Sequence, residues 1–271
     1  MQIITSIPEL HKLDNAALVP TMGNLHAGHL SLVKKAKSVA EKVIVSIFVN
    51  PLQFGPTEDF TTYPRTFEHD CHQLEQLGVD IVFVPQITDI YPNGMENSTY
   101  VQVPNLGEIL CGVSRPIFFK GITTVVNILF NLVQPDKALF GEKDYQQLFL
   151  IRRMVKDLFM PIEIIGMPII RESDGLAMSS RNNYLTTEQR KTAPVLFQTI
   201  DNTRQKLKDG NRDFATLEQQ AIVKLTESGF APDYFKIYCT DLTVPISKDS
   251  NLVILAAANL GATRLIDNCQ V

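Results

Sequence analysis

The first 170 residues alternate short apolar segments of strand character with longer segments whose apolar residues recur at helical spacing. The segment 43–49 is β-branched and almost entirely apolar, which is typical of a strand covered on both faces. Strands are predicted at 17–20, 43–49, 81–84, 137–140 and 162–165, and helices at 30–40, 66–77, 122–133 and 145–159. This alternation predicts an α/β fold, a Rossmann-like parallel sheet with helices on both faces.

The pattern changes after Arg171. Thr186 and Gln189 have the spacing of a capping box, which predicts a long helix that ends at Gly210. A second helix is predicted at 214–228, followed by strands at 234–239, 252–257 and 263–266. We therefore expect a Rossmann-like domain over residues 1–170 and a small α+β lid domain over residues 171–271, hinged near 168–176.

Composition excludes several classes of protein. Hydrophobic residues make up 45% of the chain and the formal net charge is −4, so neither disorder nor a basic nucleic-acid surface is expected. No apolar segment approaches the roughly 20 residues that cross a bilayer. The four cysteines form no CxxC pair, and the N-terminus has no signal-peptide pattern. We expect a cytoplasmic protein with no membrane or nucleic-acid partner.

The most informative motif is Pro20-Thr-Met-Gly-Asn-Leu-His-Ala-Gly-His29, between the first predicted strand and the first predicted helix. Gly23 and Gly28 would let the backbone approach a ligand closely. A helix start offers unpaired N–H groups and a positive dipole end to phosphate. His26 and His29 could donate hydrogen bonds as negative charge develops on phosphate oxygens. A lone histidine is more often a surface or capping residue, but this combination favours a phosphate-binding site.

Other polar loops follow the later strands. The amides of Asn50 and Gln53 suit a hydroxy acid, and the cations Lys143 and Arg181 suit phosphate groups. Each has an ordinary structural interpretation as well. Gln53 and Lys143 could be solvated loop residues, Gln147 could close a helix start, and Arg181 could form a salt bridge at the hinge.

The HxGH pattern resembles the ATP signature of the HIGH-type nucleotidylyl transferases. A closer similarity, from about residue 17 to the C-terminus, is to the pantothenate synthetase family. It is carried, in order, by PTMGNLHAGH, SIFVNPLQF, YPRT, IYPNG, LFNLVQPDKALFGEKDYQQL, DGLAMSSRNNYL and RLIDN. The resemblance implies that ATP activates (R)-pantoate as an acyl-adenylate. This intermediate then reacts with β-alanine to give pantothenate, with release of AMP and pyrophosphate.

The same resemblance assigns roles to individual residues. The implied catalytic residues are His26, His29, Lys143 and Arg181. The implied ATP-binding residues are Met22, Gly23, Asn24, Leu25, His26, Ala27, Gly28, His29, Gly141, Glu142, Lys143, Asp144, Ile170, Met178, Ser179, Ser180 and Arg181. Gln53 and Gln147 fall at pantoate-binding positions, and Gln53 also borders the β-alanine site.

The resemblance further implies a Mg²⁺ cofactor and a homodimer. Asp70 and Gln73 match positions associated with the metal and its waters, but His69 stands where relatives usually have an acidic residue. We therefore expect Mg²⁺ mainly on the ATP phosphates.

Three alternatives stay open at this level. One is another nucleotidylyl transferase that moves AMP or CMP onto a phosphorylated substrate, although SIFVNPLQF offers few basic residues for it. Another is a non-catalytic RNA-binding relative of a synthetase, which the acidic balance of the chain disfavours. The third is a zinc site built from His26, His29, His69 and His72.

Overall fold

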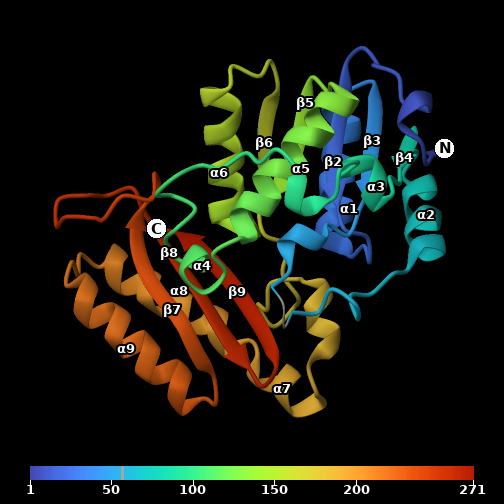
Figure 1. Ribbon diagram of the computed structural model, residues 1–271. Helices are drawn as coiled ribbons and strands as arrows, with labels where there is room; N and C mark the ends of the chain where they lie inside the picture. Colours follow the sequence, from blue (N-terminus) through green and yellow to red (C-terminus); the bar gives the residue numbers. More distant parts are fainter. Residues whose placement is uncertain (56–57) are drawn as a thin grey trace. The chain divides into compact units, whose positions relative to one another are not determined.

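The structure is a computed structural model that describes residues 1–55 and 58–271 (Figure 1). The chain divides into two compact units. The first unit contains Met1–Glu142 and Gln146–Pro168, and the second contains Lys143–Tyr145 and Ile169–Val271. The short segment Lys143–Tyr145 therefore folds with the second unit, although it lies between two elements of the first.

The first unit contains a six-stranded sheet in which every strand pair is parallel. Its strand order is β1-β4-β3-β2-β5-β6, with β1 at Gln2–Ile4, β2 at Ala16–Thr21, β3 at Lys42–Ile47, β4 at Ile81–Phe83, β5 at Lys137–Gly141 and β6 at Glu163–Met167. The five predicted strands and their parallel pairing are confirmed. Strand β1 was not predicted, because three residues at a sheet edge are too few to show periodicity.

The helices of this part of the chain are short connectors and four longer crossovers. The connectors are η1 (Ile7–Glu9), η2 (Pro51–Gln53), α3 (Ile87–Ile90), η3 (Met95–Asn97), α4 (Cys111–Ser114) and η4 (Glu142–Asp144). The crossovers are α1 (Ala27–Val39), α2 (Phe67–Gln76), α5 (Phe118–Val133) and α6 (Tyr145–Asp157). The four predicted helices are confirmed, but α1 begins three residues and α5 four residues earlier than predicted.

Helices cover both faces of the sheet. On one face, buried residues of α1 and α2 form a cluster with Val19, Val45 and Leu139 of the strands. Successive strand residues point to opposite faces, so Phe140 points away from this cluster. Its ring packs edge-on against Phe130 of α5, with 6.4 Å between the ring centroids. Helix α5 therefore covers the second face.

Helix α6 lies on the same side as α5. Ile165 of β6 packs against the α1–α2 cluster, whereas its neighbour Gly166 points the other way. A Cβ atom at Gly166 would lie 2.9 Å from Leu148 of α6. Both faces of the parallel sheet are covered, as the α/β prediction requires.

The second unit is an antiparallel sheet covered by two helices, which confirms the predicted α+β character. The strands, drawn in orange to red in Figure 1, are β7 (Ala231–Cys239), β8 (Leu252–Leu260) and β9 (Thr263–Gln270), in that order. The helices are η5 (Ser180–Tyr184), α7 (Thr187–Thr192), α8 (Val195–Lys208) and α9 (Phe214–Glu227). Buried side chains of α8 and α9 form one apolar core with the sheet.

The long helix predicted from Thr186 to Gly210 was wrong as a single element. The capping box is present, because the Thr186 Oγ1 atom accepts from the Gln189 N–H and the Gln189 side chain accepts from the Thr186 N–H. The helix is nevertheless split into α7 and α8 at Pro194. Proline has no N–H to donate and its ring clashes with the preceding turn.

The longest helix in the described part of the chain, α5, has 16 residues. Within residues 1–55 and 58–271, no helix has the length and apolar character needed to cross a membrane.

Candidate active site

The loops that carry the candidate residues of the first unit share one edge of its sheet. Strand β2 lies between β3 and β5, and all three run in the same direction. The chain continues from β2 to β3 on one side, whereas it continues from β5 to β6 on the other. The carboxyl ends of β2 and β5 therefore flank a topological switch point, where sheets of this kind bind ligands. The loop 22–26 follows β2, and Gly141 ends β5 directly before Glu142.

The HxGH motif is itself the start of helix α1. His26 is the N-cap residue and His29 lies in the first turn, so the helix begins inside the motif. This arrangement directs the first turn and the positive dipole end of α1 toward the carboxyl edge of the sheet. A helix start of this kind is a binding site for phosphate or carboxylate groups.

The two histidines form a reciprocal capping box. The Nδ1 atom of His26 accepts from the Gly28 N–H at 3.1 Å, and the Nδ1 atom of His29 accepts from the His26 N–H at 3.4 Å. Their rings lie 4.1 Å apart between centroids. A nitrogen that accepts a hydrogen bond carries no proton, so in each neutral ring the proton lies on Nε2. The backbone thus makes both Nε2–H groups donors.

Two glycines allow this turn to form. A Cβ atom at Gly28 would lie 2.7 Å from Cε1 of His26, so the ring could not rest over the helix start. Gly23 has a φ of +77°, a conformation that strains other residues, and its Cβ would lie 3.1 Å from the carboxylate of Asp70. Both glycines admit close contacts with side chains of the protein itself, and the predicted approach of a ligand stays a prediction.

Asp70 of α2 forms hydrogen bonds with the backbone of the turn 22–26. Its carboxylate is 1% exposed and accepts from the N–H groups of Asn24 and Leu25, both at 2.8 Å. The Thr66 hydroxyl donates a third hydrogen bond to it at 3.1 Å. Asp70 therefore stabilises the backbone conformation of the turn. A direct bond to Mg²⁺ does not fit a carboxylate that is buried and engaged in this way.

The second residue predicted to be associated with Mg²⁺ is Gln73, and this association stays a prediction. The Oε1 atom of Gln73 is buried and has no hydrogen-bond partner in the described structure. Across residues 1–55 and 58–271, no three His, Cys, Asp or Glu side chains are grouped so that they could hold a metal ion. The structure gives no support to the zinc alternative built on four histidines.

Gln53 is held in place by Asn50 and Arg115. The Asn50 side chain is 1% exposed; its Nδ2 donates to Gln53 Oε1 at 3.0 Å and to the Gly121 carbonyl at 3.2 Å. Its Oδ1 accepts from the Tyr91 hydroxyl at 2.7 Å, and burial raises the pKa of Tyr91, so this hydroxyl stays a donor. Asn50 therefore orients Gln53 and does not itself face a ligand, contrary to our expectation.

Arg115 fixes the backbone at the same place. Its guanidinium donates to the Gln53 carbonyl at 2.9 Å and forms two hydrogen bonds of 2.6 Å with Glu58. It also lies 3.5 Å from the centroid of the Phe118 ring. Because Oε1 of Gln53 is occupied by Asn50, its Nε2–H₂ group is the part of the amide suited to a substrate oxygen.

Two adjacent glutamines of α6 have different surroundings. Gln146 is 5% exposed; its Nε2 donates to the carbonyls of Leu106 and Ile109, both at 2.8 Å, and its Oε1 accepts from the Cys111 N–H. Gln146 thus supports a loop of the first unit. Successive helical residues point in directions about 100° apart. Gln147, the predicted pantoate residue, is therefore directed elsewhere and is half-buried.

The remaining candidate residues belong to the second unit. Lys143 and Asp144 lie in η4, and Ser179 caps η5, where its Oγ accepts from the Arg181 N–H at 3.3 Å. Ile170 is 36% exposed, and its carbonyl accepts from the Met178 N–H at 3.0 Å. The structure thus groups Lys143, Ile170 and the segment 178–181 in one unit.

Comparison with known proteins identifies the family. The family model for pantoate-beta-alanine ligase matches residues 2–270. The chain belongs to the pantoate-beta-alanine ligase family. It is therefore an enzyme of the ligase class, and the resemblance found in the sequence is confirmed.

Members of this ligase family match the chain over nearly its whole length. The pantothenate synthetase of Nitrosococcus oceani is 54% identical over 95% of this chain and 91% of its own length. That of Idiomarina loihiensis is 53% identical over 100% of this chain and 98% of its own. Family membership disfavours the RNA-binding alternative and the alternative of a transferase acting on a phosphorylated substrate.

Solved structures of the ligase family confirm the fold. The crystal structure of pantothenate synthetase from Thermus thermophilus has a TM-score of 0.94 and 42% identity, and it covers 100% of this chain and 99% of its own. The Francisella tularensis pantoate-beta-alanine ligase, crystallised with beta-gamma ATP and beta-alanine, has a TM-score of 0.84 and 36% identity. That match covers 100% of this chain and 97% of the other.

Proposed function

We propose that the enzyme condenses (R)-pantoate with β-alanine through a pantoyl-adenylate, converting ATP to AMP and pyrophosphate. Family membership supports the overall reaction. The observation that best supports the ATP chemistry is the capped histidine pair at the start of α1, at the switch point of the sheet. There two fixed Nε2–H donors and a helix N-terminus serve one anionic group.

In the first step a pantoate carboxylate oxygen attacks the α-phosphorus of ATP. The bond from that phosphorus to the bridging oxygen breaks, and pyrophosphate leaves with the electron pair. Negative charge grows on the α-phosphoryl oxygens and on pyrophosphate, so positioned donors and cations supply most of the catalysis. We assign the hydrogen-bond donation to His26 and His29, and the positive charge to Lys143 and Arg181.

The other ATP contacts follow from the same two groups of residues. In the first unit we assign Met22–His29, Gly141 and Glu142. In the second we assign Lys143, Asp144, Ile170 and Met178–Arg181. The positive dipole end of α1 suits phosphate oxygens, and the backbone N–H group of Ile170 suits the edge of a base.

Gln53 and Gln147 bind pantoate in this proposal. The fixed orientation of the Gln53 amide supports its role, because the donor group is set by Asn50 before a substrate arrives. Gln53 also borders the β-alanine site. In the second step the neutral amine of β-alanine attacks the acyl carbon, the mixed anhydride C–O bond breaks and AMP leaves.

Mg²⁺ enters as the MgATP complex, as part of the substrate. The engaged state of Asp70 supports this view over a metal held directly by the protein. When bound, the ion neutralises charge on the phosphates.

The deciding experiment measures AMP release from MgATP by the purified enzyme, with pantoate and β-alanine added singly and together. We expect AMP only when both are present, in equal amount to pantothenate and pyrophosphate. If folded enzyme that binds ATP releases no AMP with both substrates, the assignment of the acid or the amine is wrong.

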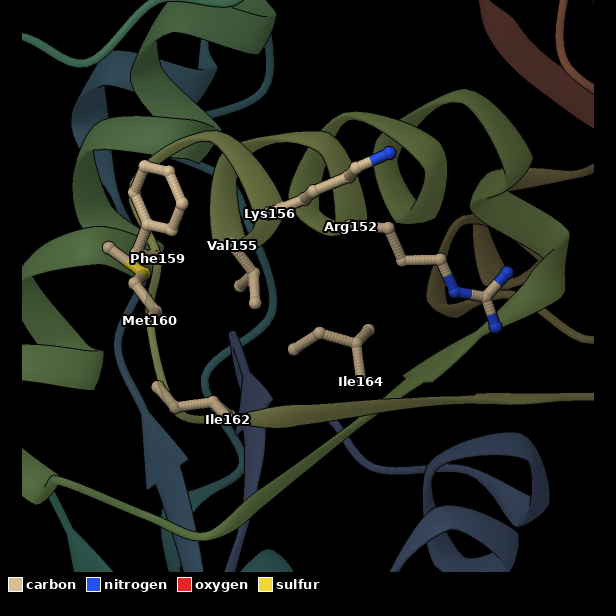
Figure 2. A pocket seen from close by; sticks show the side chains of 7 residues that line it. All are labelled: Arg152, Val155, Lys156, Phe159, Met160, Ile162 and Ile164. Carbon is tan, nitrogen blue, oxygen red and sulfur yellow. The ribbon is translucent and has the colours of Figure 1, made fainter.

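We also propose that the enzyme is a homodimer that pairs through β6. This strand is the last of its sheet, so one side of its backbone faces no strand of the described chain. Figure 2 shows the neighbouring open pocket of about 500 Å³, lined by Arg152, Val155, Lys156, Phe159, Met160, Ile162 and Ile164. Phe159 is 92% exposed and holds a φ of +52°, which is unfavourable for a bulky residue. An exposed apolar edge of this kind suits a second copy of the chain.

The mass of the enzyme in solution tests this proposal. We expect Phe159→Asp to shift the light-scattering mass from dimer to monomer. Val244→Asp, at a side chain that is 77% exposed in the second unit, is the matched control and should leave the mass unchanged. A monomeric wild type, or a dimeric Phe159→Asp variant, would contradict the proposal.

The localisation is a further proposal. The four cysteines are all thiols in the described structure, which suits the reducing cytoplasm.

A further inference from the structure

Strand β9 holds the loop that carries Lys143. The Nδ2 group of Asn268 donates to the Lys143 carbonyl at 2.9 Å, across 125 residues of sequence. Asn268 is 4% exposed, so the donor of this hydrogen bond is buried. Tyr145, two residues after Lys143, donates from its hydroxyl to the Thr240 carbonyl at 2.7 Å. The loop is therefore tied at two points to the second unit.

Asp267, the neighbour of Asn268, is the centre of a rigid polar network. Its carboxylate is 4% exposed and accepts two hydrogen bonds from Arg171, at 2.7 and 2.9 Å, and one from the Asn268 N–H at 2.7 Å. Arg171 also donates to the Gly175 carbonyl at 3.0 Å and lies 3.8 Å from the centroid of the Phe197 ring. A bidentate, stacked arginine has one well-defined orientation.

The same network supports the segment 178–181. Arg171 forms an antiparallel bridge with Ala177, and the Ala177 carbonyl accepts from Asn182 Nδ2 at 3.1 Å. Asp267, Lys143, Ser179 and Asn182 all line one small cavity of about 10 Å³. The Oδ1 atom of Asn182 is buried and has no hydrogen-bond partner in the described structure.

Charge links Lys143 to the network as well. Burial raises the pKa of Asp267, and the positive charges of Arg171 and Lys143 oppose that rise. Lys143 and Asp267 also line the same small cavity, which is the geometric basis of this effect.

We propose that Asn268 and Asp267 are positioning residues for Lys143. Asn268 fixes the backbone of the lysine, while Asp267 and Arg171 hold the lysine and the segment 178–181 as one preorganised group. The proposal rests on the proposed role of Lys143 at the ATP phosphates. Preorganisation matters here because a lysine is a flexible point charge, and phosphoryl transfer depends on where its charge lies.

A double-mutant cycle tests this proposal. Single-turnover pyrophosphate formation from MgATP and pantoate is measured for the wild type, Asn268→Ala, Lys143→Ala and the double variant. We expect Asn268→Ala to slow adenylate formation by about 10–100-fold in the wild-type background, the size typical of a displaced catalytic group. In the Lys143→Ala background the same change should cost less than about threefold, because a residue that acts through Lys143 has nothing left to position.

Two further variants guard against a trivial loss of folding. Asn268→Asp keeps the shape of the side chain but cannot donate to the Lys143 carbonyl, so it should reproduce the loss. Asp233→Asn removes the other aspartate–arginine pair of β9, between Asp233 and Arg264, and should leave the rate near that of the wild type. Equal effects of Asn268→Ala in both backgrounds, or no effect in either, would overturn the proposal.

The affinity for ATP separates this proposal from the proposed function. Calorimetric titration with ATP alone is carried out on the same proteins. If the wild type forms no adenylate from pantoate, the proposed function fails, and the cycle is then read from ATP affinity. Coupling of Asn268 and Lys143 in that affinity supports the positioning role, and additive losses refute it.

Discussion

The two groups of proposed ATP-binding residues are held in place by different means. In the first unit, the histidines of the turn 22–29 are oriented by caps between residues two or three positions apart. In the second unit, Lys143 depends on Asn268, which lies 125 positions away. The orientation of the two histidines therefore follows from a local motif. The position of the Lys143 backbone requires that strand β9 has already folded against it.

The short histidine motif still depends on one side chain from a distant part of the sequence. Asp70 lies 45 and 46 positions from the two N–H groups it accepts. Without it, the N–H groups of Asn24 and Leu25 would lose the acceptor that holds the turn. The histidine motif therefore fixes the side-chain chemistry, and a buried carboxylate fixes the backbone that presents it.

The largest effect should come from removing that support. Asp70→Ala removes the carboxylate acceptor of two backbone N–H groups, and the loss of each hydrogen bond costs about 1–3 kcal/mol. We expect unfolding in urea at a markedly lower midpoint and adenylate formation slowed by more than about 100-fold. Asp70→Asn, which keeps one acceptor oxygen, should lose less of both. Wild-type stability in Asp70→Ala would show that the turn is held by its local caps alone.

The next largest effect should come from removing one donor from each of the two groups of proposed ATP-binding residues. His29→Ala and Lys143→Ala each remove one donor to the developing charge, which should cost roughly 3–4 kcal/mol, or 10²–10³ in the rate of adenylate formation. Melting temperatures should stay close to that of the wild type, because both side chains are only half-buried. Single-turnover rates within tenfold of the wild type in both variants would contradict the proposed mechanism.

A smaller effect should follow from Gly28→Ala, which tests whether the local cap by His26 orients the histidine pair. The new Cβ would lie 2.7 Å from Cε1 of His26, so the ring must rotate away and release its cap. We expect about tenfold slower adenylate formation. Alanine also favours the helix by about 1 kcal/mol over glycine. Thermal unfolding should therefore show a stability that is unchanged or higher. A loss of stability together with unchanged activity would be the opposite of this expectation.

The smallest effect should come from Asp80, a second carboxylate that accepts a backbone N–H but lies away from the turn. Burial favours a higher pKa for Asp80, but hydrogen bonds from the Val43 N–H, Lys37 and Lys42 outweigh it and lower the pKa. A lowered pKa in the folded state stabilises the protein above the unfolded pKa of about 4, and this stabilisation is lost as the pH falls through the folded value.

Asp80→Asn should therefore cost about 1 kcal/mol at pH 7, since its lysine partners are partly exposed. The difference from the wild type should shrink as the pH falls below about 4. Urea titrations at several pH values measure the loss of stability at pH 7 and its change with pH. The rate of AMP release is the control and should not change. A difference that grows at low pH would mean that the ion pairs do not set the pKa.

Much of the fold could be predicted from the sequence, and the misses have physical reasons. Strands β2–β6 and helices α1, α2, α5 and α6 follow apolar periodicity, which the sequence displays directly. Strand β1 was missed because its three residues form a strand only through pairing with β4. The break between α7 and α8 could have been foreseen, because Pro194 is visible in the sequence.

In the candidate site, too, some residues could be predicted from the sequence and others could not. The sequence predicted the histidine pair, Gln53, Lys143 and Arg181 by residue type and by family resemblance, and their individual roles are still predictions. It did not reveal the supporting residues Thr66, Gln146, Arg171, Asp267 and Asn268. The block RLIDN pointed to the last two as part of the resemblance, but no local pattern indicates what they contact.

By itself, the sequence determined the α/β class, the family, the residue types at the proposed ATP site and the caps at Thr186, because each depends on residues that are neighbours along the chain. Only the tertiary structure decided the strand order that puts the β2 and β5 loops together, the use of Asp70 as a backbone clamp and the attachment of Lys143 to β9. Hydrogen bonds across 45 or 125 residues form only where the folded core brings their partners together, and no spacing in the sequence encodes that distance.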